Sequence, residues 1–137
     1  MTGLKLQTFC WSFLLLVSIA GVQAAATWSL PTPENVYEDL ETCRQDAQED
    51  DPSILRCLVE KLGLWTDAAG YDPKRIAKIF ASHNQEEELM LVVHYCNSKE
   101  RRIRDPSNWA FEAYKCATAG QFGRWVKDYM KDKRKFE

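Results

Sequence analysis

The chain has 137 residues, of which 45% are hydrophobic and 28% are charged, and its formal net charge at pH 7 is -2. This length and composition are typical of one globular domain and exclude collagen-like, low-complexity and wholly disordered chains. A slightly acidic chain has no overall positive field to neutralise phosphates, so we expect no nucleic acid partner.

The amino-terminal segment has the features of a secretory signal peptide. Lys5 precedes an apolar run over residues 9–20, and small residues follow up to Ala26. The run is short for a membrane span, and small residues are what signal peptidase accepts, so we expect cleavage after Ala24 or Ala26. The alternative is an uncleaved membrane anchor.

Removal of residues 1–24 leaves residues 25–137 as one secreted, extracellular domain without stable membrane insertion. It also removes Cys10 and leaves an even set of four cysteines, at Cys43, Cys57, Cys96 and Cys116. Four cysteines in a small exported protein usually form two disulfides, and three connectivities are possible. A zinc site is the alternative. Because the chain has no C-x-x-C spacing and only two histidines, we expect no metal and no other cofactor.

Proline dipeptides mark four expected helix starts, at Thr32-Pro33, Asp51-Pro52, Asp72-Pro73 and Asp105-Pro106. Each places a side-chain acceptor, which can cap free N–H groups, before a proline whose fixed φ suits the first helical turn. A fifth start is Asn84, with Glu87 in the capping-box position. Gly63, Gly120 and Gly123 mark helix ends.

Apolar residues recur at intervals of three and four between these marks, which is the period of an amphipathic helix. In chain order the six stripes contain Val36, Leu40 and Cys43; Ile54, Leu55, Leu58 and Leu62; Ile76, Ile79 and Phe80; Leu89, Val92, Val93 and Cys96; Trp109, Ala113, Cys116 and Ala117; and Phe122, Trp125, Val126 and Tyr129. No strand-like alternation of useful length occurs. The expected fold is therefore all-α, a single small disulfide-linked bundle of about six short helices.

Catalytic chemistry has little basis in the sequence. A nucleophile needs a positioned base, and no G-x-S-x-G, H-E-x-x-H, Walker or dinucleotide-binding motif accompanies His83 and His94. The acidic run at residues 86–88 lies in the first turn of an expected helix, where negative charge complements the helix dipole. We expect the protein not to be an enzyme.

A binding module has better support, because the expected domain is rich in aromatic residues. Helical domains hold small ligands in apolar cavities with a few polar groups. Most of the aromatic set must fill the core, and His94, Tyr95 and Tyr114 are the candidates for polar contacts. The candidate ligand-binding residues are Trp65, Phe80, His94, Tyr95, Trp109, Tyr114, Phe122 and Trp125.

Three segments carry the pattern of a known family. The expected domain opens with WSLPTPE at residues 28–34, and ETC follows at 41–43. The second segment is SILRCLVEKLGLW at 53–65, with GYD at 70–72, and the third is SNWAFEAYKC at 107–116. In these segments the chain resembles the insect odorant-binding proteins (PBP/GOBP superfamily), and most closely the salivary D7 proteins of mosquitoes and other blood-feeding flies.

The resemblance implies the odorant-binding-protein fold, with disulfides from Cys43 to Cys57 and from Cys96 to Cys116. Ser53 and Ser107 stand where the usual six-cysteine pattern has a third bond, which matches a four-cysteine subgroup. Only 13 residues separate Cys43 and Cys57, fewer than is usual in the family. The missing stretch ordinarily contributes a helix to one side of the ligand cavity.

The resemblance also implies a monomer that carries or sequesters small apolar or amphipathic molecules. Such molecules include odorants, lipids, and host mediators such as eicosanoids or biogenic amines. The alternative, which applies if the shortened cavity is closed, is a secreted salivary or immune-modulating effector acting through surface contacts. A basic last helix, set apart from an acidic front at residues 38–51, offers charge that can steer such a partner. A basic loop at residues 99–104 can meet an anionic ligand headgroup or a cell-surface partner.

Overall fold

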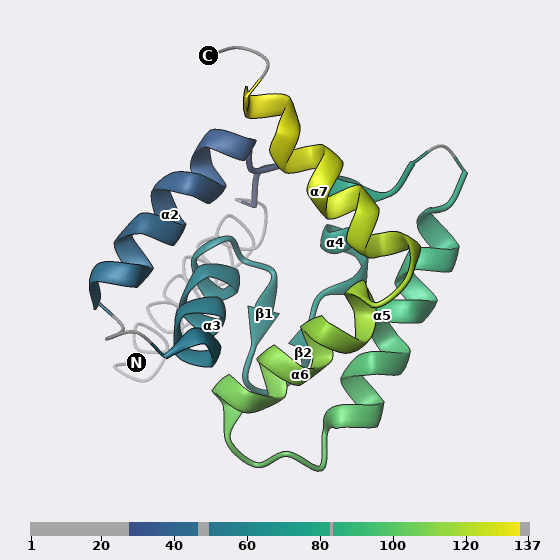
Figure 1. The fold of residues 1–137 in the computed structure, drawn as a ribbon. Helices are drawn as coiled ribbons and strands as arrows, with labels where there is room; N and C mark the ends of the chain where they lie inside the picture. Colours follow the sequence, from purple (N-terminus) through teal and green to yellow (C-terminus); the bar gives the residue numbers. More distant parts are fainter. Residues whose placement is uncertain (1–27, 47–49, 83, 135–137) are drawn as a thin grey trace, which may run out of the picture.

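The structure is a computed structural model that describes residues 28–46, 50–82 and 84–134. The expected signal peptide, Cys10 and His83 lie outside these residues. Six helices and one short hairpin make up the described part (Figure 1), namely α2 (Pro33–Asp46), α3 (Asp51–Lys61), β1 (Trp65–Thr66), β2 (Gly70–Tyr71), α4 (Pro73–Phe80), α5 (Glu86–Glu100), α6 (Pro106–Thr118) and α7 (Gln121–Arg134). The predicted all-α class and the number of helices are confirmed.

The hairpin between α3 and α4 was not predicted. Its antiparallel pairs are Trp65 with Tyr71 and Thr66 with Gly70. Gly70 has a φ of 84°, and a Cβ at this position would lie 2.8 Å from the side-chain oxygen of Asn97. Glycine is therefore needed both for the turn and for the close approach of α5. Two residues per strand are too few to produce a visible alternation in the sequence.

Three of the four proline-marked helix starts are confirmed by side-chain caps. Thr32 and Asn35 cap each other reciprocally at the start of α2, with N–O distances of 3.0 and 3.2 Å. Asp72 accepts a hydrogen bond from the backbone N–H of the residue three positions later, at 3.1 Å, and Asp105 does the same at 3.3 Å. Each of these caps satisfies an N–H group that the helix itself leaves free.

Two predicted starts are wrong in detail. The N-cap of α3 is Asp50, so Asp51 is the first helical residue, and the Asp50 carboxylate accepts from the hydroxyl of Ser53 at 2.8 Å. The N-cap of α5 is Gln85. Asn84 instead has a φ of 62°, a left-handed conformation that asparagine tolerates in turns, so it cannot serve as the predicted capping-box residue.

Both disulfides join neighbouring helices. Cys43 to Cys57 links α2 to α3, and Cys96 to Cys116 links α5 to α6, each with a Cα–Cα distance of 5.8 Å. These are the pairs that the family resemblance implied. In the chain-entropy model, closing loops of this size stabilises the domain by about 3 kcal/mol per bond.

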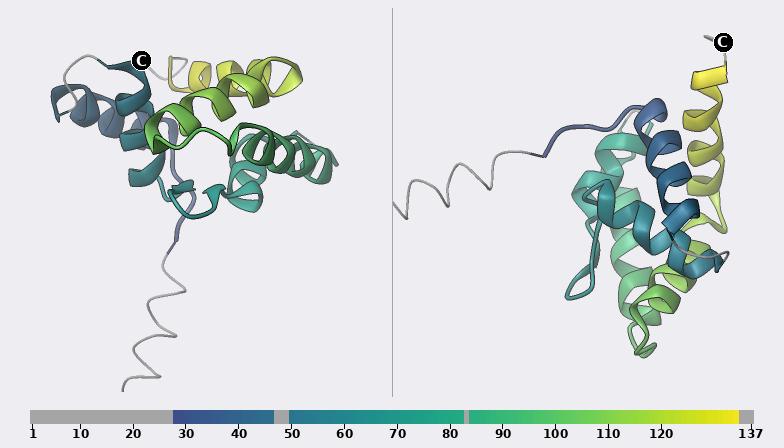
Figure 2. Two further views of the ribbon diagram at one scale, coloured as in Figure 1. Left: turned by 90° about the horizontal axis from the view of Figure 1, so that it is seen from below. Right: turned by 90° about the vertical axis from the view of Figure 1, so that its left-hand side faces the viewer.

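The helices are arranged around a central opening. α2 packs on α3, α3 on α6, and α6 on α7, and α7 returns to contact α2. This ring of four helices faces the viewer in Figure 1, while α4 and α5 lie behind α7 and α6. The hairpin lies on the opposite side of the molecule from α7, as both views of Figure 2 show. The buried core lies between the ring and this rear layer.

Candidate ligand-binding cavity

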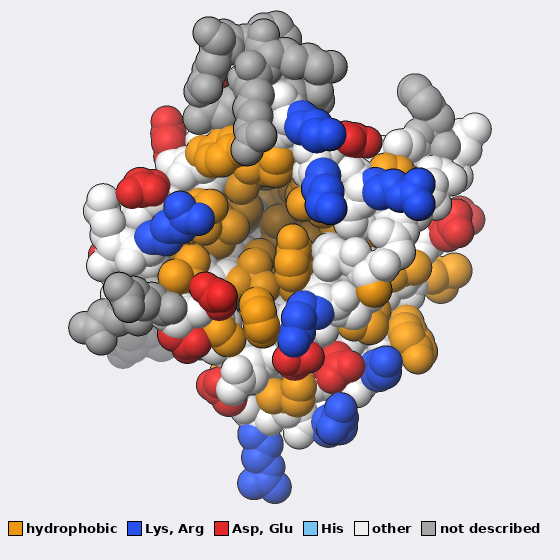
Figure 3. All heavy atoms as spheres, viewed as in Figure 1, with side chains coloured by type: hydrophobic (Ala, Val, Ile, Leu, Met, Phe, Trp, Pro, Cys, Tyr) orange, Lys and Arg blue, Asp and Glu red, His pale blue; other side chains and the backbone are white. Residues whose placement is uncertain are grey.

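An apolar cavity of about 240 Å³ occupies the opening inside the helix ring. All six described helices contribute to its lining, together with β2 and the residue before β1. Figure 3 shows the hollow from its open side, with hydrophobic side chains covering its visible walls. The short connection between the first two cysteines of the domain has therefore not closed the cavity.

The walls formed by α2 and α3 are aliphatic. Their apolar stripes border the same side of the cavity and carry Val36, Leu40, Leu55, Leu58 and Leu62. The same 3.6-residue period that makes each helix amphipathic aligns these side chains on the inner face. This side of the cavity offers only apolar contact.

The walls formed by α6 and α7 combine small and large side chains. Ala113 and Ala117 lie one turn apart on α6 and leave space in front of that helix. Phe122, Val126 and Met130 follow one another at intervals of four on α7 and border the same space. The space left by the two alanines of α6 is thus not filled by the large side chains of α7.

Two tyrosines supply the hydroxyl groups of the lining. The hydroxyl of Tyr71 donates to the carbonyl of Ala110 at 2.8 Å and is already satisfied. The hydroxyl of Tyr114 has no hydrogen-bond partner within the described ranges of the chain. Burial raises the pKa of Tyr114 and of Tyr71, so both hydroxyls are neutral at physiological pH. Tyr114 therefore presents a hydrogen-bonding group to whatever occupies the cavity.

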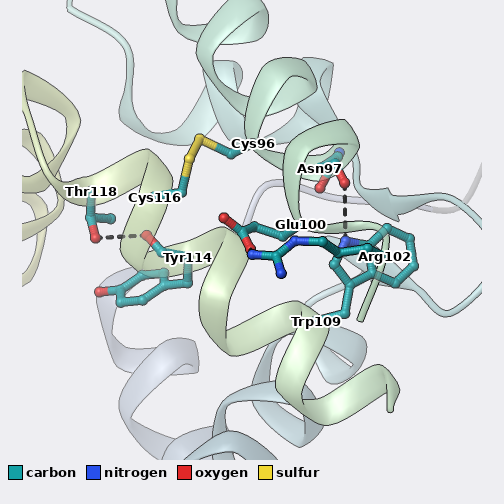
Figure 4. The surroundings of a disulfide bond; sticks show 8 residues. All are labelled: Cys96, Asn97, Glu100, Arg102, Trp109, Tyr114, Cys116 and Thr118. Carbon is teal, nitrogen blue, oxygen red and sulfur yellow. Dashed lines mark hydrogen bonds and ion pairs between the residues drawn. A yellow bond between two sulfur atoms is a disulfide. The ribbon is translucent and has the colours of Figure 1, made fainter. Parts of the chain in front are cut away.

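A packed aromatic cluster supports the floor of the cavity. Trp65 meets Tyr71 and Trp109 edge to face, with ring centroids 4.8 and 4.7 Å apart. The side chain of Asn97 bonds both backbone groups of Tyr71, at 3.0 and 2.8 Å, and the backbone carbonyl of Asn97 accepts from the Trp109 indole at 3.1 Å. Figure 4 shows the Trp109 ring beside Asn97. The Tyr114 side chain extends from α6 in a different direction, away from Trp109. Asn97 is thus the buried polar residue that holds the hairpin against α5 and α6.

The structure brings only part of the predicted ligand-binding set together. Phe80, Tyr114 and Phe122 line the cavity. Trp65 and Trp109 are buried behind its floor, with 3% and 4% of their surface exposed.

The other three candidates lie outside the cavity. Trp125 packs against the core where α7 meets α5, on a different side of α7 from the cavity. His94 and Tyr95 are on the exposed side of α5, where Tyr95 is 61% exposed. The basic loop at residues 99–104 does not line the cavity either, and Arg101 stacks on the Trp109 ring instead.

Sequence reasoning missed most of the aliphatic lining. Most of the missed side chains had been placed only on apolar helix stripes, namely Val36, Leu40, Leu55, Leu58, Leu62 and Val126, and Met130 had not been singled out at all. A stripe of leucine and valine has the same appearance whether it packs against another helix or faces an open cavity. The one sequence feature that indicates unfilled space is the pair of small residues on the apolar stripe of α6, Ala113 and Ala117.

Comparison with known families identifies this arrangement. Residues 29–119 match the model of the PBP/GOBP family, which covers more than half of the chain. The chain belongs to the PBP/GOBP family. Members of this family are binding proteins of small ligands and are typically secreted. No curated protein and no solved structure matched the chain.

Two further observations concern the described residues of this family member. None of their helices is both long and apolar enough to cross a bilayer. They also hold no group of three or more His, Cys, Asp or Glu side chains that could bind a metal ion. The family match ends before α7, so this helix, which completes the cavity, lies beyond the matched segment.

Proposed function

We propose that the protein binds a small apolar or amphipathic molecule in the central cavity and carries or sequesters it. The observation that carries this proposal is an open, almost wholly apolar cavity with one available hydroxyl, at Tyr114. Enclosed apolar surface with few polar groups is typical of small-molecule sites. The alternative of a surface-acting effector assumed a closed cavity, and the open cavity favours the carrier.

The size and lining of the cavity narrow the ligand class. Its volume of about 240 Å³ is slightly below the usual range for drug-sized ligands, so a small odorant or a single acyl chain fits best. None of the described lining residues is acidic, so the walls offer no carboxylate to an ammonium group. Odorants, fatty-acid derivatives and eicosanoids are therefore better candidates than biogenic amines.

A chain-length series tests the proposal. Linear alcohols are added to the protein loaded with the fluorescent probe N-phenyl-1-naphthylamine, and displacement of the probe gives their affinities. Each additional methylene buried is worth about 0.8 kcal/mol, so we expect affinity to rise about fourfold per carbon until the cavity is full. Absence of displacement at every chain length contradicts the proposal.

A cavity-filling variant locates the site. Ala117→Leu adds a larger side chain to the cavity wall, so we expect it to weaken the binding of the longer alcohols at least tenfold while the helices remain folded, in line with the loss of about two buried methylenes. Ala68→Leu is the matched control, because Ala68 is exposed in the hairpin turn away from the cavity. Equal affinities for the two variants place the ligand elsewhere.

We further propose that the protein is a secreted, D7-like, salivary carrier of the four-cysteine type. Support comes from the signal-peptide features of residues 1–26, the two disulfides of the domain and the segments that resemble D7 proteins. The mass of the protein recovered from the culture medium of insect cells should correspond to a chain beginning at Ala25 or Thr27. A product that retains Met1 in the membrane fraction contradicts secretion.

A further inference from the structure

A second, polar groove adjoins the apolar cavity. It lies between α6 and α7, has a volume of about 440 Å³, and shares Tyr114 and Val126 with the cavity lining. Away from these shared residues its walls carry Gln121, Arg124 and Lys127. Tyr114 and Val126 therefore border both spaces, with an apolar lining on one side and a polar, basic lining on the other.

The cations of this groove have no partners in the described parts of the chain. Arg124 and Lys127 are exposed, and none of the ion pairs among the described residues includes either of them. Lys115 of α6, in contrast, is paired with Glu112 at 2.9 Å. Basic side chains border the hollow on the side of α7 in Figure 3. The groove thus has positive charge that no ion pair among the described residues neutralises.

We propose that the groove between α6 and α7 is a headgroup site for the carboxylate of an acyl-chain ligand. The chain of such a ligand occupies the apolar cavity, and its carboxylate lies beside the Tyr114 hydroxyl, within reach of Arg124 and Lys127. This inference rests on the proposed function, because it assumes that the cavity holds the apolar part of the ligand.

The chemistry of the two spaces supports an anionic ligand over a neutral or cationic one. A carboxylate accepts hydrogen bonds from a tyrosine hydroxyl, a guanidinium and an ammonium, which are the donors present at the junction and in the groove. An ammonium headgroup would instead meet two like charges. Exposed ion pairs are individually weak and are screened by salt, so the preference for the carboxylate should be moderate and largest at low salt.

Three ligands with the same chain and different headgroups test the site. Decanoate, decanol and decylamine are compared by displacement of N-phenyl-1-naphthylamine at pH 7.5 and low salt. For the unmodified protein we expect decanoate to bind about tenfold more tightly than decanol, and decylamine to bind most weakly. In about 0.5 M salt the difference between decanoate and decanol should shrink to about twofold, because the Debye length falls below the separation of exposed charges.

A charge-matched pair of double variants locates the headgroup. Arg124→Gln with Lys127→Gln removes both groove cations and should abolish the preference for decanoate without changing the affinity for decanol. Lys78→Gln with Lys99→Gln changes the net charge equally, at exposed positions of α4 and α5 outside both spaces, and should keep the preference. Unchanged decanol binding also shows that each variant is folded.

The outcomes separate the two proposals. If decanol binds but decanoate is not preferred, the headgroup site is wrong and the proposed function stands. If both double variants lose the preference equally, net charge rather than the groove is responsible, and the headgroup site is again wrong. If none of the three ligands binds the unmodified protein, both proposals are overturned.

Discussion

The hydrogen bonds of single residues decide which aromatic side chains of this protein are available to a ligand. Trp109 is rich in apolar surface, but its indole is committed to the carbonyl of Asn97 and its ring packs against Trp65. Tyr114 lies on the same helix and keeps a free hydroxyl at the cavity wall, as far as the described part of the chain shows. Residue type alone predicts both as ligand contacts, because the sequence does not reveal the direction or partners of a side chain.

Asp67 illustrates a polar contact that the sequence did not predict. Its carboxylate accepts from the Arg56 guanidinium at 3.1 Å and from the Trp65 indole at 2.8 Å, which ties the hairpin to α3. The hydrogen bond from Arg56, followed by that from Trp65, holds the pKa of Asp67 below its usual range. A carboxylate whose folded-state pKa is lowered stabilises the fold above its unfolded pKa, and this contribution is lost as pH falls through the folded value.

The Asp67→Asn variant tests this contact. We expect the free energy of unfolding at pH 7 to fall by up to about 1 kcal/mol, because the pair is substantially exposed to solvent. As pH falls below about 4 and through the lowered folded-state pKa of Asp67, the difference from the unmodified protein should shrink, since the carboxylate becomes protonated. Urea unfolding at pH 7 and pH 3 measures this, with Glu41→Gln on the exposed side of α2 as the control. An equal difference at both pH values contradicts the assignment.

At the scale of elements, α7 depends on contacts that are distant in sequence. The hydroxyl of Tyr129 donates to the carbonyl of Pro31 at 2.9 Å, across 98 positions of the chain. The ring of Phe80 meets Phe122 and Tyr129 at centroid distances of 5.5 and 5.1 Å. These contacts hold α7 against α4 and against the segment that leads into α2, and so complete one wall of the cavity.

Tyr129→Phe tests how α7 is held. Burial raises the pKa of Tyr129 to about 12, so its contribution to stability is present below the unfolded pKa of about 10 and is lost as pH rises through about 12. We expect the variant to lose about 1 kcal/mol at pH 8 through the missing hydrogen bond, and to lose less stability than the unmodified protein between pH 10 and 12.

Urea unfolding monitored by tryptophan fluorescence at pH 8 and pH 11 measures both effects. Tyr95→Phe is the matched control, because Tyr95 is largely exposed on α5. Parallel pH profiles for Tyr129→Phe and the unmodified protein would show that the Tyr129 hydroxyl is not buried against the Pro31 carbonyl.

The helices were predicted better than the hairpin, and Gly63 and Gly120 do follow helix ends, whereas Gly123 lies within α7 and is not the predicted stop. Three proline-marked starts were correct because the acceptor side chain, the proline and the following helix are adjacent in sequence. The start of α5 was misplaced because Asn84 can either cap a helix or adopt a left-handed turn, and the preceding turn decides between them. The hairpin escaped prediction because its register depends on Asn97, which lies 26 positions away from Tyr71.

At the scale of the whole molecule, the family pattern makes a prediction about two serines. Ser53 lies in the first turn of α3 and Ser107 in the first turn of α6, and these helices pack together. Arg56, one turn after Ser53, donates to the hydroxyl of Ser107 at 3.5 Å. The double substitution Ser53→Cys with Ser107→Cys should therefore oxidise spontaneously to a third disulfide. Its loop is long, so the chain-entropy model predicts about 4 kcal/mol of stabilisation before strain.

Peptide mapping without reduction shows whether the new bond forms, and thermal unfolding gives its contribution to stability. The two single variants serve as controls for the loss of each serine hydroxyl. New cysteines that remain free, or that pair with Cys57 or Cys116, would contradict the four-cysteine relationship to the family. The helical architecture would remain, since it does not depend on these two positions.

Short-range patterns in the sequence were sufficient to predict the helices, the all-α fold class and the family. Capping groups and apolar periods act within one or two turns, and the family pattern consists of short contiguous segments. The cavity could not be predicted in the same way. It is an unfilled volume bounded by all six described helices. It exists because side chains from α2, α3, α6 and α7 border the same space without filling it. Such a volume is set by tertiary packing, because no single segment contains more than one of its walls.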